Sequence, residues 1–225
     1  MSSDSLNMRG GDAEFASTLA RGLTPLAAFR HGDDVLGNAE LARRTGLTRP
    51  MVARLTATLV ELGYLHRQPD GGGYRLGARL LTVAHLLLGR LRVRQAARPV
   101  LTELADYVRG AVSIATIDRL DAVFVETAPS AESYPLSPDI GTTVPLLQTA
   151  AGRALLSLLE PGALSTTLAS FAAERPLLWA RLHASAEAEV RRARTQGYAL
   201  SLGDFRPEVH AVARADGRTV TRRNP

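Results

Sequence analysis

The sequence predicts an α+β protein of two domains, a small helical domain at the N-terminus and a mixed α/β domain after it. Three observations support this division. Apolar residues before residue 76 recur at intervals of three and four, as they do in amphipathic helices. Two β-branched runs, at residues 111–117 and 122–127, favour a hairpin in the second half. A chain of 225 residues is also long enough to bury two cores.

Composition excludes several classes of protein. The chain contains no cysteine, which rules out disulfide frameworks, thiolate catalysis and cysteine-based zinc sites. The longest apolar stretch, residues 76–91, is interrupted by two arginines and a histidine, so we expect no membrane partner. The polar N-terminus lacks the apolar run of a signal peptide. We therefore expect a cytoplasmic protein in which residues 1–12 form a disordered tail.

Residues 38–62 have the pattern of two helices joined by a tight turn. Asn38 is the expected N-cap of the first helix, and Gly46 supplies the positive φ that such a turn requires. Thr48 is expected to cap the second helix, and Pro50 lies in its first turn, where a missing N–H is harmless. The second helix should bury one apolar face, formed by Val52, Leu55, Leu59 and Leu62.

The segments on either side complete a winged helix-turn-helix domain over residues 13–76. Gly63 closes the second helix, and two short strands at residues 64–67 and 74–76 flank a Pro-Asp-Gly-Gly-Gly turn. An opening helix over residues 13–30 should pack against the pair of helices. The side that we expect it to bury carries Phe15, Leu19, Leu23 and Leu26.

Positive charge is concentrated around this motif, as binding to a polyanion requires. Residues 41–94 carry ten arginines and two acidic residues, a net charge of +8, whereas the whole chain has +5. The expected DNA contacts in and beside the second helix are Thr48, Arg49, Met51 and Arg54. Four further arginines are expected to contact phosphate: Arg43, Arg44, Arg67 and Arg75. A solvated basic surface without a partner is the alternative.

A helix over residues 77–93 is apolar on more than one side and is expected to link the domains. Its simplest partner is the same helix of a second subunit, which would match a palindromic operator, and packing against its own opening helix is the alternative. Residues 94–225 form the second domain, which begins with a helix over residues 95–109. We expect that helix to bury Val100, Leu101, Leu104 and Val108. Further helices at residues 150–159, 161–174 and 186–196, and strands at 198–200 and 209–213, should complete a mixed sheet.

Three stretches resemble the IclR family of bacterial transcription regulators, named for the isocitrate lyase regulator. Residues 17–23 look like the opening helix of the branch that controls aromatic-acid breakdown through the β-ketoadipate pathway. Residues 41–64 resemble the helix-turn-helix of the family, and residues 141–154 are similar to its effector-domain signature. The resemblance implies double-stranded operator DNA as partner, a GAF-like effector-binding domain for a small organic acid, and homodimers or homotetramers that repress or activate.

The sequence also departs from the family pattern. Pro50-Met51 stands where small residues are more common, and Leu147 and Arg153 replace a histidine and a lysine of the effector signature. The family usually continues past the equivalent of Val220 with a strand and a helix, so we expect a truncated effector domain. The resemblance implies these effector-pocket residues: Thr142, Thr143, Thr149, Ser201 and Asp204. Turn and cap roles explain three of them, Thr142, Thr149 and Asp204, equally well.

Enzymatic chemistry finds no support in the sequence. The five histidines are scattered, with no pair at metal-binding spacing, and Gly71-Gly72-Gly73 lacks the Lys-Ser/Thr of a phosphate-binding loop. We expect no enzyme activity, no cofactor and no metal. Two alternatives to a ligand-controlled regulator remain: a ligand-blind DNA-binding oligomer, and a small-molecule-binding module that has lost its operator.

Overall fold

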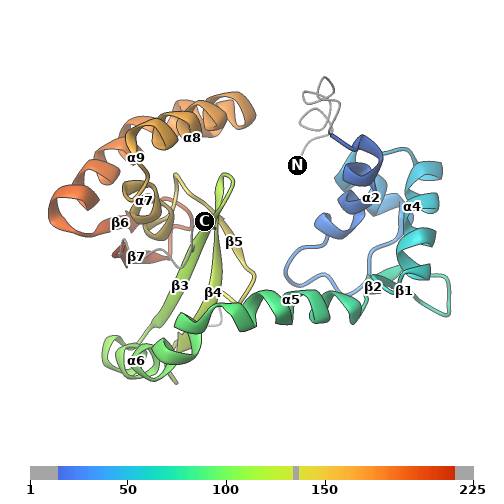
Figure 1. Ribbon diagram of the computed structural model, residues 1–225, viewed down its shortest axis with the longest axis horizontal. Coiled ribbons are helices and arrows are strands. Elements are labelled where there is room, and N and C mark those ends of the chain that lie inside the picture. Colours follow the sequence, from blue (N-terminus) through green and yellow to red (C-terminus); the bar gives the residue numbers. More distant parts are fainter. Residues whose placement is uncertain (1–14, 134–136, 216–225) are drawn as a thin grey trace, which may run out of the picture. The chain divides into compact units, whose positions relative to one another are not determined.

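The computed structural model describes residues 15–133 and 137–215, which divide into two compact units (Figure 1). Unit 1 ends at Arg90 and unit 2 begins at Leu91. The expected N-terminal tail and the residues after Ala215 lie outside the described residues. Both units contain helices and short sheets, which confirms the predicted α+β class.

Unit 1 is a winged helix-turn-helix, as predicted. Its elements in chain order are α2 (Ser17–Ala27), α3 (Asn38–Thr45), α4 (Arg49–Glu61), β1 (Leu65–Arg67), β2 (Tyr74–Leu76) and α5 (Arg79–Arg90). The strands β1 and β2 pair antiparallel and form the wing, with Leu65 opposite Leu76. The buried core combines residues from the helices and the wing: Leu36, Leu41, Val52, Leu59, Leu65 and Tyr74.

Three glycines fix the turns of unit 1. Gly46 and Gly63 end α3 and α4 with φ of 71° and 75°, as the sequence predicts. Gly73, with φ of 142°, holds the wing against the segment before α3. A Cβ at this glycine would lie 2.6 Å from the carbonyl oxygen of Leu36, which bonds the Tyr74 N–H at 2.9 Å. Only glycine permits this close approach.

The apolar side expected to be buried on the opening helix is only partly buried, since Leu26 packs against the core of unit 1. Leu19 and Leu23 of α2 are 63% and 52% exposed, while Thr24 and Pro25 are buried. The Thr24 hydroxyl donates to the carbonyl oxygen of Ala20 at 3.0 Å, which satisfies its polarity inside the unit. The described unit therefore covers the end of this apolar side at Leu26 and leaves Leu19 and Leu23 exposed.

Three details of the helix-turn-helix also differ from expectation. Leu62 follows the end of α4 and is 49% exposed. Thr56 lies on the buried face of α4 instead, and its hydroxyl donates to the Val52 carbonyl oxygen. Thr48 occupies the N-cap position of α4, but its hydroxyl makes no capping bond. Asn38 is the first residue of α3, and Gly37 holds the cap position.

Unit 2 is an α/β unit whose described strands pair only antiparallel, so the expected single mixed sheet is wrong. Its elements are α6 (Arg92–Val108), β3 (Ala111–Asp118), β4 (Asp121–Pro129), β5 (Thr143–Pro145), α7 (Ala150–Ser157), α8 (Pro161–Glu174), α9 (Pro176–Gln196), β6 (Ala199–Leu202) and β7 (His210–Ala213). One sheet has the order β3-β4-β5, and β6 and β7 form a second, two-stranded sheet. The predicted β3–β4 hairpin is confirmed, with Asp118 paired to Asp121 across its turn.

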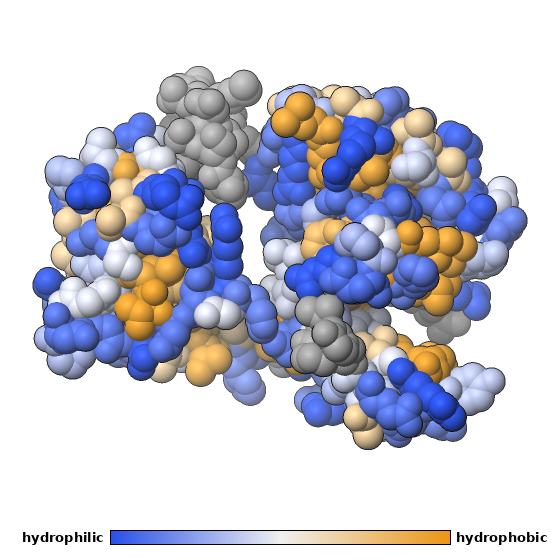
Figure 2. Space-filling view, turned by 180° about the vertical axis from the view of Figure 1, so that it is seen from behind, coloured by the Kyte–Doolittle hydropathy of each residue, from blue (hydrophilic) through white to orange (hydrophobic). Residues whose placement is uncertain are grey.

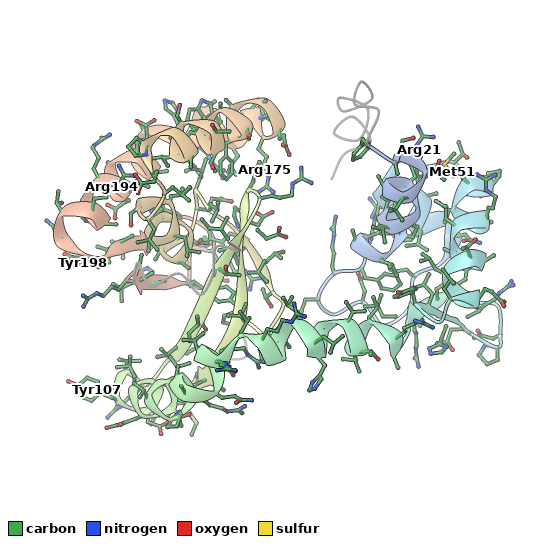
Figure 3. All side chains as sticks on the ribbon, viewed as in Figure 1. Arg21, Met51, Tyr107, Arg175, Arg194 and Tyr198 are labelled. Carbon is green, nitrogen blue, oxygen red and sulfur yellow. The ribbon has the colours of Figure 1, made fainter. Side chains whose placement is uncertain are left out.

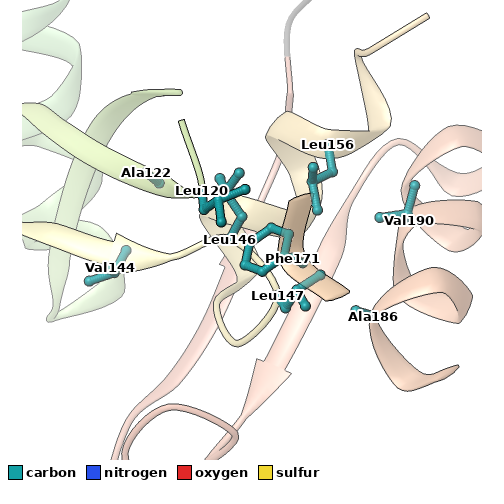
Figure 4. Packing of buried hydrophobic residues seen from close by; sticks show 9 residues of the cluster. All are labelled: Leu120, Ala122, Val144, Leu146, Leu147, Leu156, Phe171, Ala186 and Val190. Carbon is teal, nitrogen blue, oxygen red and sulfur yellow. The ribbon is translucent and has the colours of Figure 1, made fainter. Parts of the chain in front are cut away.

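The helix α7 contacts strands of both sheets and packs against α9, which in turn packs against α8. Figure 4 shows the core of unit 2, in which the Phe171 ring lies among the side chains of Leu146, Leu147 and Leu120. Gly152 is required where α7 meets the preceding segment, because a Cβ there would lie 2.3 Å from backbone atoms of Leu146. The helix α9 begins at Pro176, ten residues before its predicted start, because proline is compatible with the first turn of a helix.

The buried face expected on α6 is mostly wrong. Leu101 is 9% exposed and Ala105 is fully buried, where they pack against β3 and β4. Val100, Leu104 and Val108 are exposed instead. The sheet covers only a narrow stripe of this helix, so the rest of its apolar side faces solvent. Apolar residues are visible at the surface of both units in Figure 2.

Candidate functional site

The N-terminal half of α4 presents an exposed basic surface in unit 1. The opposite side of the helix is anchored by Val52, Thr56 and Leu59, all buried. This anchorage leaves Arg49 and Arg54 exposed at the surface. The first turn of α4 carries no acidic residue, so the partial positive charge of the helix N-terminus is not offset there. The arrangement suits contact with phosphate or with base edges.

The neighbouring predicted contacts differ in accessibility. Thr48 is exposed in an extended backbone conformation, with φ of −68° and ψ of 149°, and its hydroxyl is not used to cap the helix. Met51 is half-buried on α4 (Figure 3). Arg67 and Arg75 are both exposed on the wing, and Arg75 Nη2 donates to Asp34 Oδ2 at 2.6 Å. Because that ion pair is itself exposed, it holds Arg75 only weakly.

Arg44 has a different environment from the other arginines of unit 1. Its side chain is 13% exposed and forms a bidentate ion pair with Asp33. It also donates to Glu40 Oε1 at 2.6 Å and to the carbonyl oxygen of Ala28 at 3.0 Å. These bonds tie α3 to the loop before it. The guanidinium is thus committed within the unit, whereas Arg43, whose side chain is 71% exposed, projects into solvent beside its Glu40 contact.

Ion pairing shifts the pKa values within the cluster formed by Asp33, Glu40, Arg43 and Arg44. Hydrogen bonds from Arg43 and Arg44 lower the pKa of the Glu40 carboxyl to about 2. The hydrogen bond from Arg44, followed by one from the Arg30 backbone N–H, lowers the pKa of Asp33. The same carboxylates raise the pKa of Arg44. Both carboxylates are therefore ionised at neutral pH and fix the guanidinium in place.

In unit 2, three of the five predicted effector residues meet around the start of α7. The Thr149 hydroxyl accepts from the Gly152 N–H at 3.1 Å and donates to the Pro145 carbonyl oxygen at 3.0 Å, as an N-cap. Ser201 is buried, and its hydroxyl donates to the Gln148 carbonyl oxygen at 2.9 Å. The other two residues, Thr142 and Thr143, lie on and beside β5.

Arg153 is the residue of this region that sequence reasoning did not place among the site residues. It is 2% exposed, and its Nε donates to the Leu147 carbonyl oxygen at 2.9 Å. Its Nη1 donates to the Leu200 carbonyl oxygen and to Asp204 Oδ2, both at 2.7 Å. Asp204, the fifth predicted effector residue, is thereby joined to α7. The signal in the sequence was a charged residue within an otherwise apolar helical run.

A small hollow opens between α7, α8 and α9, and sequence reasoning gave no indication of it. Its volume is about 160 Å³. Apolar side chains of the three helices form its walls, and charged groups of α9 stand at its rim. The lining residues are Leu147, Leu156, Leu164, Leu168, Ala186, Glu187, Val190, Arg191 and Arg194. Arg194 donates to the carbonyl oxygens of Ser157 and Leu159, and Arg191 lies 3.7 Å from the carboxylate of Glu187, so these charged groups have partners within the unit.

Two domain families match this chain and together span most of both units. The IclR helix-turn-helix domain matches residues 18–69, which contain α4, and the bacterial transcriptional regulator IclR C-terminal domain matches residues 85–216. The chain belongs to the IclR family. The members of this family are transcriptional regulators and not enzymes, which agrees with the lack of a catalytic constellation in the sequence.

Individual IclR relatives agree with this assignment. The regulator TsaQ1/TsaQ2 of Comamonas testosteroni is 39% identical over 141 residues, which are 62% of this chain and 50% of that protein. The Pca regulon regulatory protein of Pseudomonas putida is 32% identical and matches over 67% of this chain and 51% of its own length. The chain thus spans about half the length of these curated relatives.

A solved structure shares the fold over a larger share of its length. The IclR family regulator from Brucella abortus is 34% identical, with a TM-score of 0.76, covering 90% of this chain and 77% of that one.

Among the described residues, none of the helices has the length and apolar character that a membrane span needs.

Proposed function

We propose that this protein acts in the cytoplasm as a transcription regulator that binds double-stranded operator DNA through α4 and the wing. The observation that carries the proposal is the exposed N-terminal half of α4, where Arg49 and Arg54 stand opposite a buried apolar face. A helix held in this way can enter the major groove with its N-terminal residues at the base edges. Arginine there binds guanine bidentately or clamps phosphate.

The arginines of unit 1 have different proposed roles, according to whether other groups of the unit already bond them. Arg49 and Arg54 read or grip the DNA from α4, and Met51 beside them contacts a thymine methyl group. Arg43 and the two wing arginines contact phosphate. Arg44 is removed from the DNA-contacting set, because two carboxylates and a backbone carbonyl already occupy its guanidinium. It positions α3, which in turn supports α4.

The test is fluorescence anisotropy with DNA from upstream of the protein's own gene and with a scrambled duplex, over a series of salt concentrations. Arg54→Ala should weaken selective binding by about 1–3 kcal/mol if this side chain reads a base. Arg181→Ala, which removes an exposed arginine of α9 in unit 2, is the matched control and should leave affinity unchanged. Equal binding of both duplexes by the unmodified protein would reject the proposal.

A two-fold dimer formed through α5 would present two copies of α4 to a palindromic operator. None of the α5 residues is buried within the described unit. Its exposed apolar residues are Leu81, Val83, Leu86 and Leu87. Leu19 and Leu23 of α2 add further exposed apolar area to unit 1. Because α5 is not covered by its own opening helix, a second subunit is the partner that we assign to it.

For unit 2 we propose a small carboxylic or aromatic acid as effector, which shifts the balance between arrangements of the paired DNA-binding units. Thermal unfolding with protocatechuate and 4-hydroxybenzoate tests this, because a ligand at a hundredfold excess over its Kd stabilises by about 2.7 kcal/mol. The methyl ester of 4-hydroxybenzoate is the control for the carboxylate. Leu168→Trp, which fills the hollow between the helices, and Asp204→Asn, which alters the Arg153 region, locate the binding site.

A ligand-blind regulator is the second candidate, and one observation favours it. Thr149, Ser201 and Asp204 all use their polar groups in hydrogen bonds within the unit. A ligand at those residues must compete with bonds that already exist. Selective DNA binding that no acid alters, together with unchanged thermal unfolding, would establish this candidate over the ligand-controlled one.

A further inference from the structure

The hollow between α7, α8 and α9 is a gap in the core of unit 2. Six of its nine lining residues are apolar, and all six belong to the buried cluster around Phe171 or pack against it. Figure 4 shows Leu147 and Leu156 on one side of this space and Ala186 and Val190 of α9 on the other. Protein interiors contain few voids larger than a water molecule. A space of about 160 Å³ is therefore large enough to hold a ligand.

The charged residues that line the hollow do not favour an anion inside it. Arg194 donates from Nε to the Ser157 carbonyl oxygen at 3.1 Å and from Nη2 to the Leu159 carbonyl oxygen at 2.7 Å. Arg191 Nη1 lies 3.7 Å from Glu187 Oε2. Both lining arginines of the described structure thus have partners, and the Glu187 carboxylate would repel an anion beside it. A neutral molecule meets neither obstacle.

The apolar walls do not favour water either. A buried water molecule normally makes about three hydrogen bonds, and the six apolar side chains offer it no donor or acceptor. Apolar protein cavities of about 150 Å³ stay dry and bind benzene. The hollow has a similar volume and a similar lining, so its chemistry selects a small apolar compound.

The hollow can be reached from solvent. Leu164 and Leu168 of α8 are only half-buried, and Arg191 and Arg194 of α9 are exposed. A small molecule can therefore enter between α8 and α9 without unfolding of the unit.

We propose that this hollow is a binding site for a neutral apolar molecule about the size of one aromatic ring. The inference goes beyond the proposed DNA binding and does not depend on it, and its ligand differs in charge from the proposed acid effector. Leu147 links the hollow to the Arg153 region, because its side chain lines the hollow and its carbonyl oxygen accepts from Arg153 Nε at 2.9 Å. A bound molecule packs against Leu147 and stabilises the segment that holds Arg153.

Calorimetric titration of the full chain with toluene, benzoate and benzylammonium tests the proposal, since these compounds share one ring and differ in charge. Toluene should bind, and Leu168→Trp, which fills the hollow, should abolish that binding. Leu177→Trp is the matched control at an 89% exposed leucine of α9 and should bind toluene like the unmodified protein. An unchanged circular dichroism spectrum is the folding control for both variants.

Three results would overturn the proposal. The first is the absence of toluene binding to the unmodified protein. The second is equal toluene binding by Leu168→Trp and Leu177→Trp, which would place the compound elsewhere. The third is binding of benzoate or benzylammonium that Leu168→Trp abolishes, because the hollow would then accept a charged ligand.

An enlarged hollow provides a test that does not rely on the tryptophan variant. Leu168→Ala should bind naphthalene, which the unmodified hollow is too small to hold. Equal naphthalene binding by both proteins would contradict the assigned site. Arg54→Ala, which should weaken DNA binding, should bind toluene like the unmodified protein. The hollow can thus be rejected while DNA binding is intact, and it can be established where DNA binding fails.

Discussion

Arg44 in unit 1 and Arg153 in unit 2 both hold chain segments together, but they do so in different surroundings. Arg44 is partly accessible and bonds two carboxylates, those of Asp33 and Glu40. Arg153 is almost fully buried, and it bonds two backbone carbonyl oxygens and a single carboxylate, that of Asp204. All 27 basic residues of the chain are arginine, so residue type alone says nothing about role. The difference lies in the partners.

The Arg44 and Arg153 clusters should therefore lose different amounts of stability when their arginine is replaced. The Arg44 cluster is partly exposed to solvent, so water can replace a lost hydrogen bond there. Around Arg153, lost bonds leave buried carbonyl groups without partners, and the cost of each is about 1–3 kcal/mol. Unit 2 consequently depends more on its arginine than unit 1 does.

The largest effect is expected from Arg153→Leu. Removing the guanidinium leaves the carbonyl oxygens of Leu147 and Leu200 unbonded and Asp204 unpaired, and should destabilise unit 2 by about 3 kcal/mol. Urea unfolding followed by the fluorescence of Trp179, the single tryptophan of the chain, reports on this unit. Arg181→Leu, at an exposed arginine, is the control and should shift the midpoint little. Equal midpoints for the two variants would show that Arg153 is not a structural link.

A smaller effect distinguishes Arg44, which holds α3 in place, from Arg54, which is proposed to bind DNA. Arg44→Ala should lower the thermal midpoint of the protein, because α3 loses its bonds to Asp33 and to the Ala28 carbonyl oxygen. Arg54→Ala should leave the midpoint unchanged and weaken DNA binding instead. Circular dichroism and DNA anisotropy on both variants make the comparison. If Arg44→Ala lowered DNA affinity with no change in stability, this arginine would return to the DNA-contacting set.

The sequence predicted the fold of unit 1 well, for physical reasons visible in particular residues. Gly46 and Gly63 marked helix ends because both positions require positive φ, and the spacing of Val52 and Leu59 located the buried face of α4. The Arg44–Asp33 pair could not be predicted. It joins residues eleven apart that a loop brings together, and no local spacing indicates such a contact.

Unit 2 was predicted less completely. The hairpin of β3 and β4 was evident from its β-branched runs, but the periodicity of α6 could not tell which part of its apolar side the sheet would cover. Leu101 is buried and Val100 next to it is exposed, a distinction that depends on where β3 and β4 pass. In the candidate site, Thr149 was identified with its cap role, whereas the burial of Arg153 depends on Leu200, which lies far along the chain.

The smallest expected effect is a difference in acid sensitivity that originates in unit 1. Glu40 has its pKa lowered from 4.5 to about 2, first by the hydrogen bond from Arg43 and then by the one from Arg44. A folded-state pKa below the unfolded value means that the ionised group contributes stability above pH 4.5 and loses that contribution as the pH falls toward about 2. Glu40→Gln should therefore flatten the fall of the thermal midpoint within this window. Glu61→Gln, at an exposed carboxylate that ends α4, is the control and should follow the unmodified protein. Coincident pH profiles for Glu40→Gln and the unmodified protein would show that the Glu40 carboxylate does not stabilise α3, and would leave the bonds of Arg44 to Asp33 and to the Ala28 carbonyl oxygen as the links that hold this helix.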